Sequence, residues 1–111
     1  MTDRYILDGK TPVPCEDLVE WGKWYRNNRE ARRVARDVIS GKLVSTIFLA
    51  SDHAVYELGE SGPLLFETMV FADETNHQDI YMDRCSTWEE AEAMHASVVE
   101  MVKTGQIKER E

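Results

Sequence analysis

A run of arginines directly after a group of aromatic residues has the chemistry that a nucleotide-binding site needs. Four arginines lie within eight residues of one another and follow two aromatic residues, namely Arg29, Arg32, Arg33 and Arg36 after Trp24 and Tyr25. Guanidinium groups bind phosphate through paired hydrogen bonds, and aromatic faces stack on bases. We therefore expect a small anionic, nucleotide-type ligand here, with Trp24 or Tyr25 stacking on its ring.

Two other interpretations of the arginines stay open. On a regular strand, Arg32 and Arg36 share one face and Arg33 points to the other, so a site that joins all three needs a bend or a second subunit. Alternatively, the aromatic residues belong to the core, and the arginines pair with the acidic helix of a neighbouring chain.

Asp52 and His53 form a second candidate site, because they follow a predicted strand, where functional groups commonly lie. Together with Glu67 and His77 they could hold a metal, or His53 could act as a general base in a small enzyme. No H-E-x-x-H, paired-cysteine or G-x-S-x-G spacing supports either chemistry. We expect no catalytic residue, metal or cofactor, and we expect the loop with His53 to contact the ligand.

Hydroxyl and imidazole groups elsewhere carry weaker signals. Ser45 and Thr46 resemble a nucleophile only if a partner is present, and the spacing reveals none. His95 lies near the apolar stripe of a predicted helix, which favours a partly buried structural histidine.

Charge is unevenly distributed over the 111 residues, whose formal net charge is −8. Residues 23–36 sum to +5, the remainder to −13, and residues 52–111 alone to −10. A generic polybasic nucleic-acid binder is therefore excluded, and nucleic acid is an unlikely partner. The acidic half suggests an alternative function, a protein-binding inhibitor or DNA mimic that acts on another protein.

Composition bounds the remaining possibilities. The length fits one domain, 1–111, and no segment approaches the ~18 apolar residues that a membrane span needs. No signal peptide opens the sequence, and Cys15 and Cys85 are too few for a disulfide scaffold or zinc cluster. We expect two reduced thiols in a cytoplasmic protein.

Hydrophobic periodicity predicts the order helix, four strands, helix. Residues 1–14 are expected to form an N-terminal arm and 106–111 a frayed tail. A helix from about residue 15 or 16 to 27 precedes strands at 34–39, 43–50, 64–71 and 80–85, and a second helix covers 88–103. Thr87 and Glu90, or Ser86 and Glu89, have the spacing of a capping box at its start, and Gly105 is expected to end it.

The predicted fold class is α+β, an antiparallel four-stranded meander covered by two helices on one face. The strands carry apolar residues on both sides, among them Ile47, Leu49, Leu65, Met69 and Phe71. Such strands favour a sheet that is buried on both faces. In a domain this small, a second copy is a common cover, so we expect a homo-oligomer.

Four segments resemble a widespread family of small uncharacterised phage and prophage proteins. They are VSTIFL at 44–49, DH at 52–53, PLLFETMVF at 63–71 and TWEEAEA at 87–93, and the opening YILDG at 5–9 is also similar. The chain departs from that family after His53, where AVYEL at 54–58 replaces a glycine-rich stretch. The resemblance implies a viral origin but carries over no site residue. It implies a counter-defence protein in the host cytoplasm that blocks a host protein or sequesters a nucleotide signal.

Overall fold

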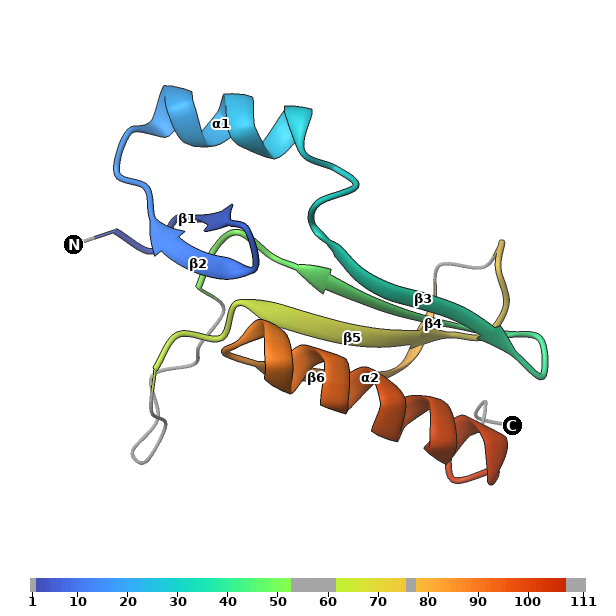
Figure 1. Cartoon of the computed structure of the whole chain (residues 1–111). Helices are drawn as coiled ribbons and strands as arrows, with labels where there is room; N and C mark the ends of the chain where they lie inside the picture. Colours follow the sequence, from blue (N-terminus) through green and yellow to red (C-terminus); the bar gives the residue numbers. More distant parts are fainter. Residues whose placement is uncertain (1, 53–61, 76–77, 108–111) are drawn as a thin grey trace.

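The computed structural model describes residues 2–52, 62–75 and 78–107 of the chain (Figure 1). The elements in chain order are β1 (Tyr5–Asp8), β2 (Thr11–Pro14), α1 (Leu18–Asn27), β3 (Arg33–Ile39), β4 (Lys42–Phe48), β5 (Phe66–Phe71), β6 (Asp79–Cys85) and α2 (Trp88–Lys103). None of the helices in these ranges is long and apolar enough to cross a membrane.

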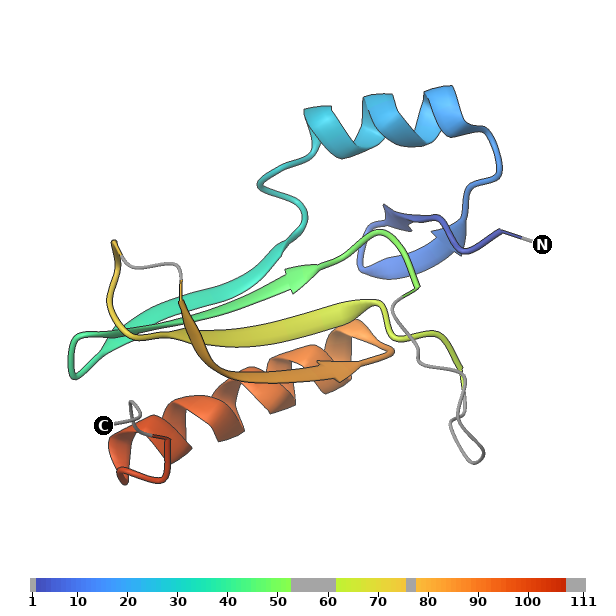
Figure 2. The same ribbon diagram turned by 180° about the vertical axis from the view of Figure 1, so that it is seen from behind.

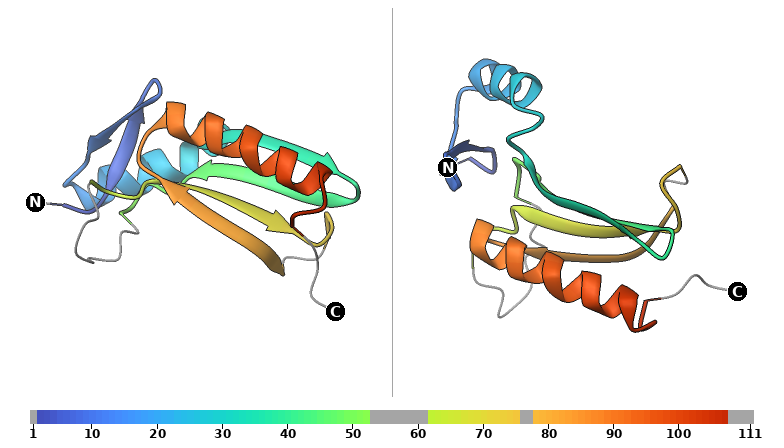
Figure 3. Two further views of the ribbon diagram at one scale, coloured as in Figure 1. Left: turned by 90° about the horizontal axis from the view of Figure 1, so that it is seen from below. Right: turned by 45° about the vertical axis from the view of Figure 1, so that its right-hand side comes forward.

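A four-stranded antiparallel sheet in the order β3-β4-β5-β6 forms the centre of the fold, so the predicted α+β meander is confirmed. The helices do not share a face of it, contrary to our expectation. In Figure 1, α2 lies along one face, whereas α1 lies on the other side, over one end of the sheet. The view turned by 45° in Figure 3 shows the same arrangement.

The predicted N-terminal arm contains a β-hairpin. Strands β1 and β2 pair in a regular antiparallel register around Gly9, whose φ of 63° is a conformation that glycine adopts without strain. Trp21 of α1 ties this hairpin to the end of β4. Its indole Nε1–H donates to the carbonyl oxygens of Tyr5, at 3.1 Å, and Ala50, at 2.9 Å. The hairpin and α1 therefore form one unit at the end of the sheet.

Local sequence signals explain where the helices begin. Asp17 is the N-cap of α1 and accepts from the backbone amides of Val19 and Glu20, which starts this helix two or three residues later than expected. At the start of α2, Thr87 and Glu90 each bond the other's backbone amide, which confirms the capping box.

The C-terminal end of α2 is a Schellman motif. The amides of Gly105 and Gln106 donate to the carbonyls of Val102 and Met101, and Gly105 has a φ of 77°. The chain then turns back, and Ile107 packs against the core with only 5% of its surface exposed. The expected frayed tail is therefore ordered at its first residues, because an apolar side chain follows the cap; residues 108–111 lie outside the described ranges.

Two apolar clusters hold the layers together. One, around Phe48, Phe66 and Leu65, joins α1 and the hairpin to the sheet and to the start of α2. The other, around Val44 and Val70, packs under the second half of α2. The first cluster lies at the end of the sheet, and the second lies on the face that α2 covers. Within the described residues, the opposite face has no helix along its length (Figure 2).

Candidate functional site

The uncovered side of the sheet, which we call the open face, brings the arginines together with apolar residues. Its three rows across β3, β4, β5 and β6 are Arg33, Ile47, Glu67 and Arg84; Arg36, Ser45, Met69 and Met82; and Val38, Leu43, Phe71 and Asp79. Val38 and Met82 are 44% and 43% exposed, although both are large apolar residues. The open face therefore combines an apolar middle with guanidinium groups at two edges.

A β-bulge in β3 places two arginines on this face. Arg33 pairs with Ile47 and Ala35 pairs with Thr46, so Val34 is the extra residue between them. Because of this bulge, Arg33 and Arg36 lie on the same face although they are three residues apart. The expectation that Arg32 shares a face with Arg36 and opposes Arg33 is wrong, because β3 begins only at Arg33 and the bulge shifts the alternation.

The partners of these two arginines hold them weakly. Arg33 is 3.7 Å from Glu30, and Arg36 is 3.8 Å from Glu74, measured between guanidinium nitrogen and carboxylate oxygen. The arginine side chains are 48% and 42% exposed, and both carboxylates are more exposed still. Exposed pairs of this kind contribute only ~0–1 kcal/mol. A phosphate group can therefore replace either carboxylate.

Arg32 lies at the end of the sheet next to α1. Its guanidinium carbon stands 3.7 Å from the ring centroid of Tyr25, and the Tyr25 ring also stacks with Trp21 at a centroid distance of 5.3 Å. The Nε atom of Arg32 is buried and has no hydrogen-bond partner among the described residues. The cation–π contact fixes the guanidinium group and occupies the Tyr25 ring. Ring stacking of a ligand on Tyr25 therefore requires Arg32 to move.

The other predicted ligand-binding residues lie apart from the open face or outside the described ranges. Trp24 packs edge-on against Phe48 in the core, with 5.9 Å between ring centroids. Arg29 follows α1, is exposed, and forms no ion pair with another described residue. His53 and His77 lie outside the described ranges.

Asp52 has a structural role at the start of its loop. Its Oδ1 atom accepts a hydrogen bond of 3.0 Å from the amide of Leu64, which is the turn interaction that an Asp at a strand end commonly makes. Within the described ranges, no group of three His, Cys, Asp or Glu side chains could hold a metal ion.

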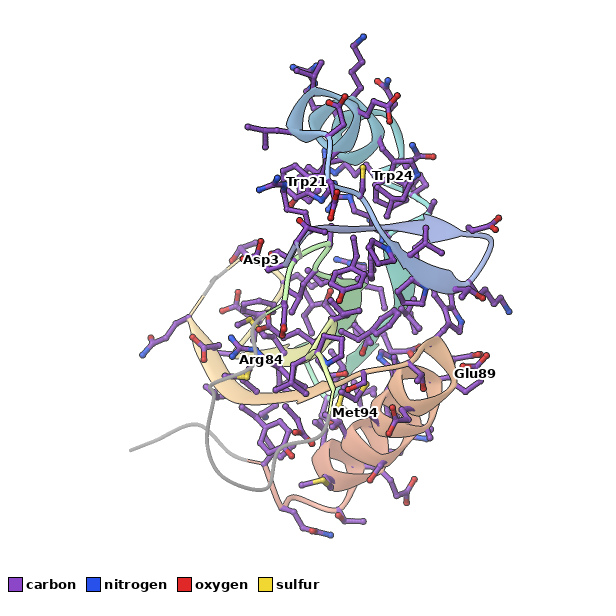
Figure 4. All side chains as sticks on the ribbon, turned by 90° about the vertical axis from the view of Figure 1, so that its left-hand side faces the viewer. Asp3, Trp21, Trp24, Arg84, Glu89 and Met94 are labelled. Carbon is purple, nitrogen blue, oxygen red and sulfur yellow. The ribbon has the colours of Figure 1, made fainter. Side chains whose placement is uncertain are left out.

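An ion pair on the open face was not predicted from the sequence. The Nε atom of Arg84 lies 2.9 Å from Oε2 of Glu67, and these side chains are only 25% and 9% exposed. A shorter, less exposed pair is stronger than the pairs of Arg33 and Arg36. Figure 4 shows Arg84 on the side of β6 away from α2, whereas Met94 lies on the helix side. Only the strand register reveals this pair, since 17 residues separate its members.

On the opposite face, His95 links α2 to two strands of the sheet. Its Nε2–H donates to Oδ2 of Asp37 at 2.7 Å, and its Nδ1 lies 2.7 Å from the Thr46 hydroxyl, which also bonds Thr68. This connectivity resembles that of a hydroxyl nucleophile, base and carboxylate. Thr46 and Thr68 are fully buried and His95 is 6% exposed, so a substrate cannot reach the hydroxyl. His95 is therefore the partner of Thr46 in a structural hydrogen-bond network and does not activate the hydroxyl for catalysis.

Comparisons with known protein families, with curated proteins and with solved structures find no match to the chain. The arrangement of side chains is thus the basis on which a function is proposed.

Proposed function

We propose that the chain is a non-enzymatic binding protein that captures a small anionic, nucleotide-type ligand on the open face. The observation that carries this proposal is the bulge in β3, which puts Arg33 and Arg36 on one face with partners that an anion can displace. Neighbouring rows on one face of a strand are about 6.6 Å apart, a spacing at which two guanidinium groups can hold one diphosphate.

The middle of the open face suits the ring of such a ligand. Ile47 pairs with Arg33, and Ser45 stands between Arg36 and Met69 in the neighbouring row. Apolar residues with a few polar groups are typical of sites for small ligands. In the proposed complex, phosphates pair with Arg33 and Arg36, the ring lies on Ile47 and Met69, and Arg32 approaches from the α1 side.

The biological role belongs to the same proposal. The resemblance of segments 44–49, 63–71 and 87–93 to small phage proteins supports a counter-defence protein that sequesters a nucleotide signal in the host cytoplasm. Apolar residues exposed on the open face support the expected homo-oligomer, in which a second copy completes the cover over the bound ligand.

Native mass spectrometry of the purified chain, incubated with a panel of cyclic and ADP-ribose-type nucleotides, tests this function. We expect a complex that retains one unaltered nucleotide per site. Replacing Arg33 and Arg36 by Ala should weaken binding about 10- to 100-fold for each guanidinium, since a hydrogen bond to a charged group contributes ~1.5–3 kcal/mol. Arg26→Ala is the matched control, because it removes an exposed guanidinium of α1 that does not belong to the three rows of the open face.

The outcomes separate capture from its alternatives. A folded double variant that still binds the nucleotide as tightly as the unmodified protein would rule out the open face. A nucleotide whose mass changes during incubation would indicate an enzyme instead.

A second function is favoured by the acidic side of α2. Glu89, Glu92 and Glu100 are exposed and recur at helical spacing, and Figure 4 shows Glu89 pointing away from the body. Such a row fits an inhibitor that covers a basic surface of a host protein. This function predicts a heterocomplex with host protein that weakens steeply as salt is raised.

A further inference from the structure

A groove of about 410 Å³ runs between β6 and α2, on the face opposite the proposed ligand site. Tyr81, Asp83 and Cys85 of β6 line one wall, because these alternate residues pair with the α2-facing residues of β5. Ala93, Met94 and Ser97 lie along the helical wall. Two of these helical residues are small, which leaves room for side chains that enter from outside.

The groove exists because α2 does not cover the sheet evenly. The helix packs most closely on β3, where His95 bonds Asp37, and least on β6. Figure 3, in the view from below, shows α2 crossing the sheet with β6 beside it. Within the described chain, β6 pairs only with β5, so it is an edge strand with an apolar groove at its side.

Negative charge distinguishes this groove from an ordinary apolar one. Asp83 and Glu90 both line it, and Arg84, which also lines it, is already paired with Glu67. Burial, followed by the charge of Glu90, raises the pKa of the Cys85 thiol from 9.0 to about 11. Burial and then the charge of Asp83 raise the pKa of Tyr81. Both carboxylates therefore act on the groups inside the groove.

We propose that β6 and this groove bind an extended, basic segment of a partner protein, which adds to the sheet as a fifth strand. A free strand edge supplies main-chain hydrogen bonds, and pockets beside it accept alternate side chains of the added strand. The side chains of the added strand that point to the α2 side all face the groove. Apolar ones among them enter between β6 and Ala93, Ser97 and Met101, and Lys or Arg ones among them approach Asp83 and Glu90.

The other edge of the sheet is built differently. Beside β3, α2 lies close to the strand, and its His95 is bonded to Asp37. The bulge at Val34 also interrupts its ladder. The two ends of the sheet are thus different surfaces, and strand addition at β6 is independent of anion capture on the open face.

Amide hydrogen exchange, followed by NMR on the full chain, tests the proposal with a probe peptide. The probe is an N-acetylated nonapeptide with threonine at the even positions and lysine and valine by turns at the odd positions, so that lysine and valine point to the same face. Its control carries glutamate in place of lysine. We expect slower exchange of β6 amides with the lysine peptide and no change with the glutamate peptide. The double variant of Arg33 and Arg36 should bind the lysine peptide normally, which separates this test from that of the proposed function.

A pair of tryptophan variants locates the binding site. Ala93 and Ala96 are both exposed, but Ala93 lines the groove and Ala96 does not, so Ala93→Trp places a large side chain at the groove and Ala96→Trp places the same side chain elsewhere on α2. We expect at least a tenfold loss of peptide affinity for Ala93→Trp and none for Ala96→Trp, with circular dichroism showing that both are folded. Asp83→Asn should weaken binding and reduce its dependence on salt.

Three results would overturn the proposal. The first is unchanged exchange of β6 amides at millimolar peptide. The second is that the Ala93→Trp and Ala96→Trp variants bind the lysine peptide equally well, or that the unmodified protein binds the lysine and glutamate peptides equally well. The third is protection of β6 amides without peptide in a self-associated form, which would assign the edge to a second copy of the chain.

Discussion

Replacing Thr46 by Val is predicted to destabilise the fold strongly, although the two side chains have nearly the same shape. Thr46 is fully buried, and its hydroxyl is bonded to both Thr68 and Nδ1 of His95. The valine variant leaves these two partners buried without a hydrogen bond, because Thr68 is fully buried and His95 is 6% exposed. Each such group costs ~1–3 kcal/mol, so the free energy of unfolding should fall by about 2–6 kcal/mol.

A double-variant cycle separates this cause from general disturbance of the core. Thr68→Val alone leaves the Thr46 hydroxyl bonded to His95, so its cost should be only about 0.5–1.5 kcal/mol. In the Thr46→Val/Thr68→Val variant, only Nδ1 of His95 is left unpaired. The double variant should therefore be more stable than Thr46→Val alone, with a coupling energy of about 1–3 kcal/mol.

Urea unfolding, followed by circular dichroism, measures these differences in the free energy of unfolding. The slope of that free energy against urea concentration should be the same in all the variants. Two results would refute the reasoning. One is a Thr46→Val variant within about 0.5 kcal/mol of the unmodified protein, a change typical of surface positions. The other is strict additivity of the two substitutions, which would mean that the hydroxyls do not act as a pair.

Three further predictions concern the helix ends and the groove. Thr87→Ala removes the N-cap of α2 and should lower stability by about 0.5–2 kcal/mol in thermal unfolding, whereas Ala96→Ser on the same helix should change it by less than about 0.5 kcal/mol. Gly105→Ala forces a side chain to a φ of 77° and should cost about 1–2 kcal/mol; an unchanged melting temperature would contradict the Schellman geometry. Burial, then the charge of Glu90, raises the pKa of Cys85 to about 11, so iodoacetamide should modify it about 100-fold more slowly at pH 8 than a free cysteine. Because this pKa is raised in the folded chain, the associated stability is present below pH 9 and is lost between pH 9.0 and about 11; equal alkylation rates in folded and urea-unfolded protein would disprove the shift.

Local patterns predicted most of the elements because they depend on neighbours in the chain. The capping box at Thr87 and Glu90 and the glycine after α2 act within one helical turn, and the structure confirms both. The apolar strands could be predicted from the sequence because their residue pattern is also local. The arm expected at residues 1–14 contains a hairpin instead, and its strand β2 includes Pro12 and Pro14, which strands at the edge of a sheet tolerate.

The site depended on pairings that no local pattern contains. One extra residue, Val34, decides that Arg33 and Arg36 share a face, and the bulge follows from the register with β4. His95 meets Asp37 across 58 residues of sequence, and Arg84 meets Glu67 across 17. Spacing alone could identify the chemistry of these side chains but not their partners.

Binding of an anion to the open face is tested most directly by the side-chain Nε–H resonances of the arginines in a ¹⁵N-labelled sample. Pyrophosphate and a nucleoside diphosphate serve as probes, at constant ionic strength. The resonances of Arg33 and Arg36 should shift and saturate together with the amides of Ser45 and Ile47, while that of Arg26 stays in place. Absence of saturable shifts, or shifts of equal size at Arg26, would show that the open face does not capture an anion.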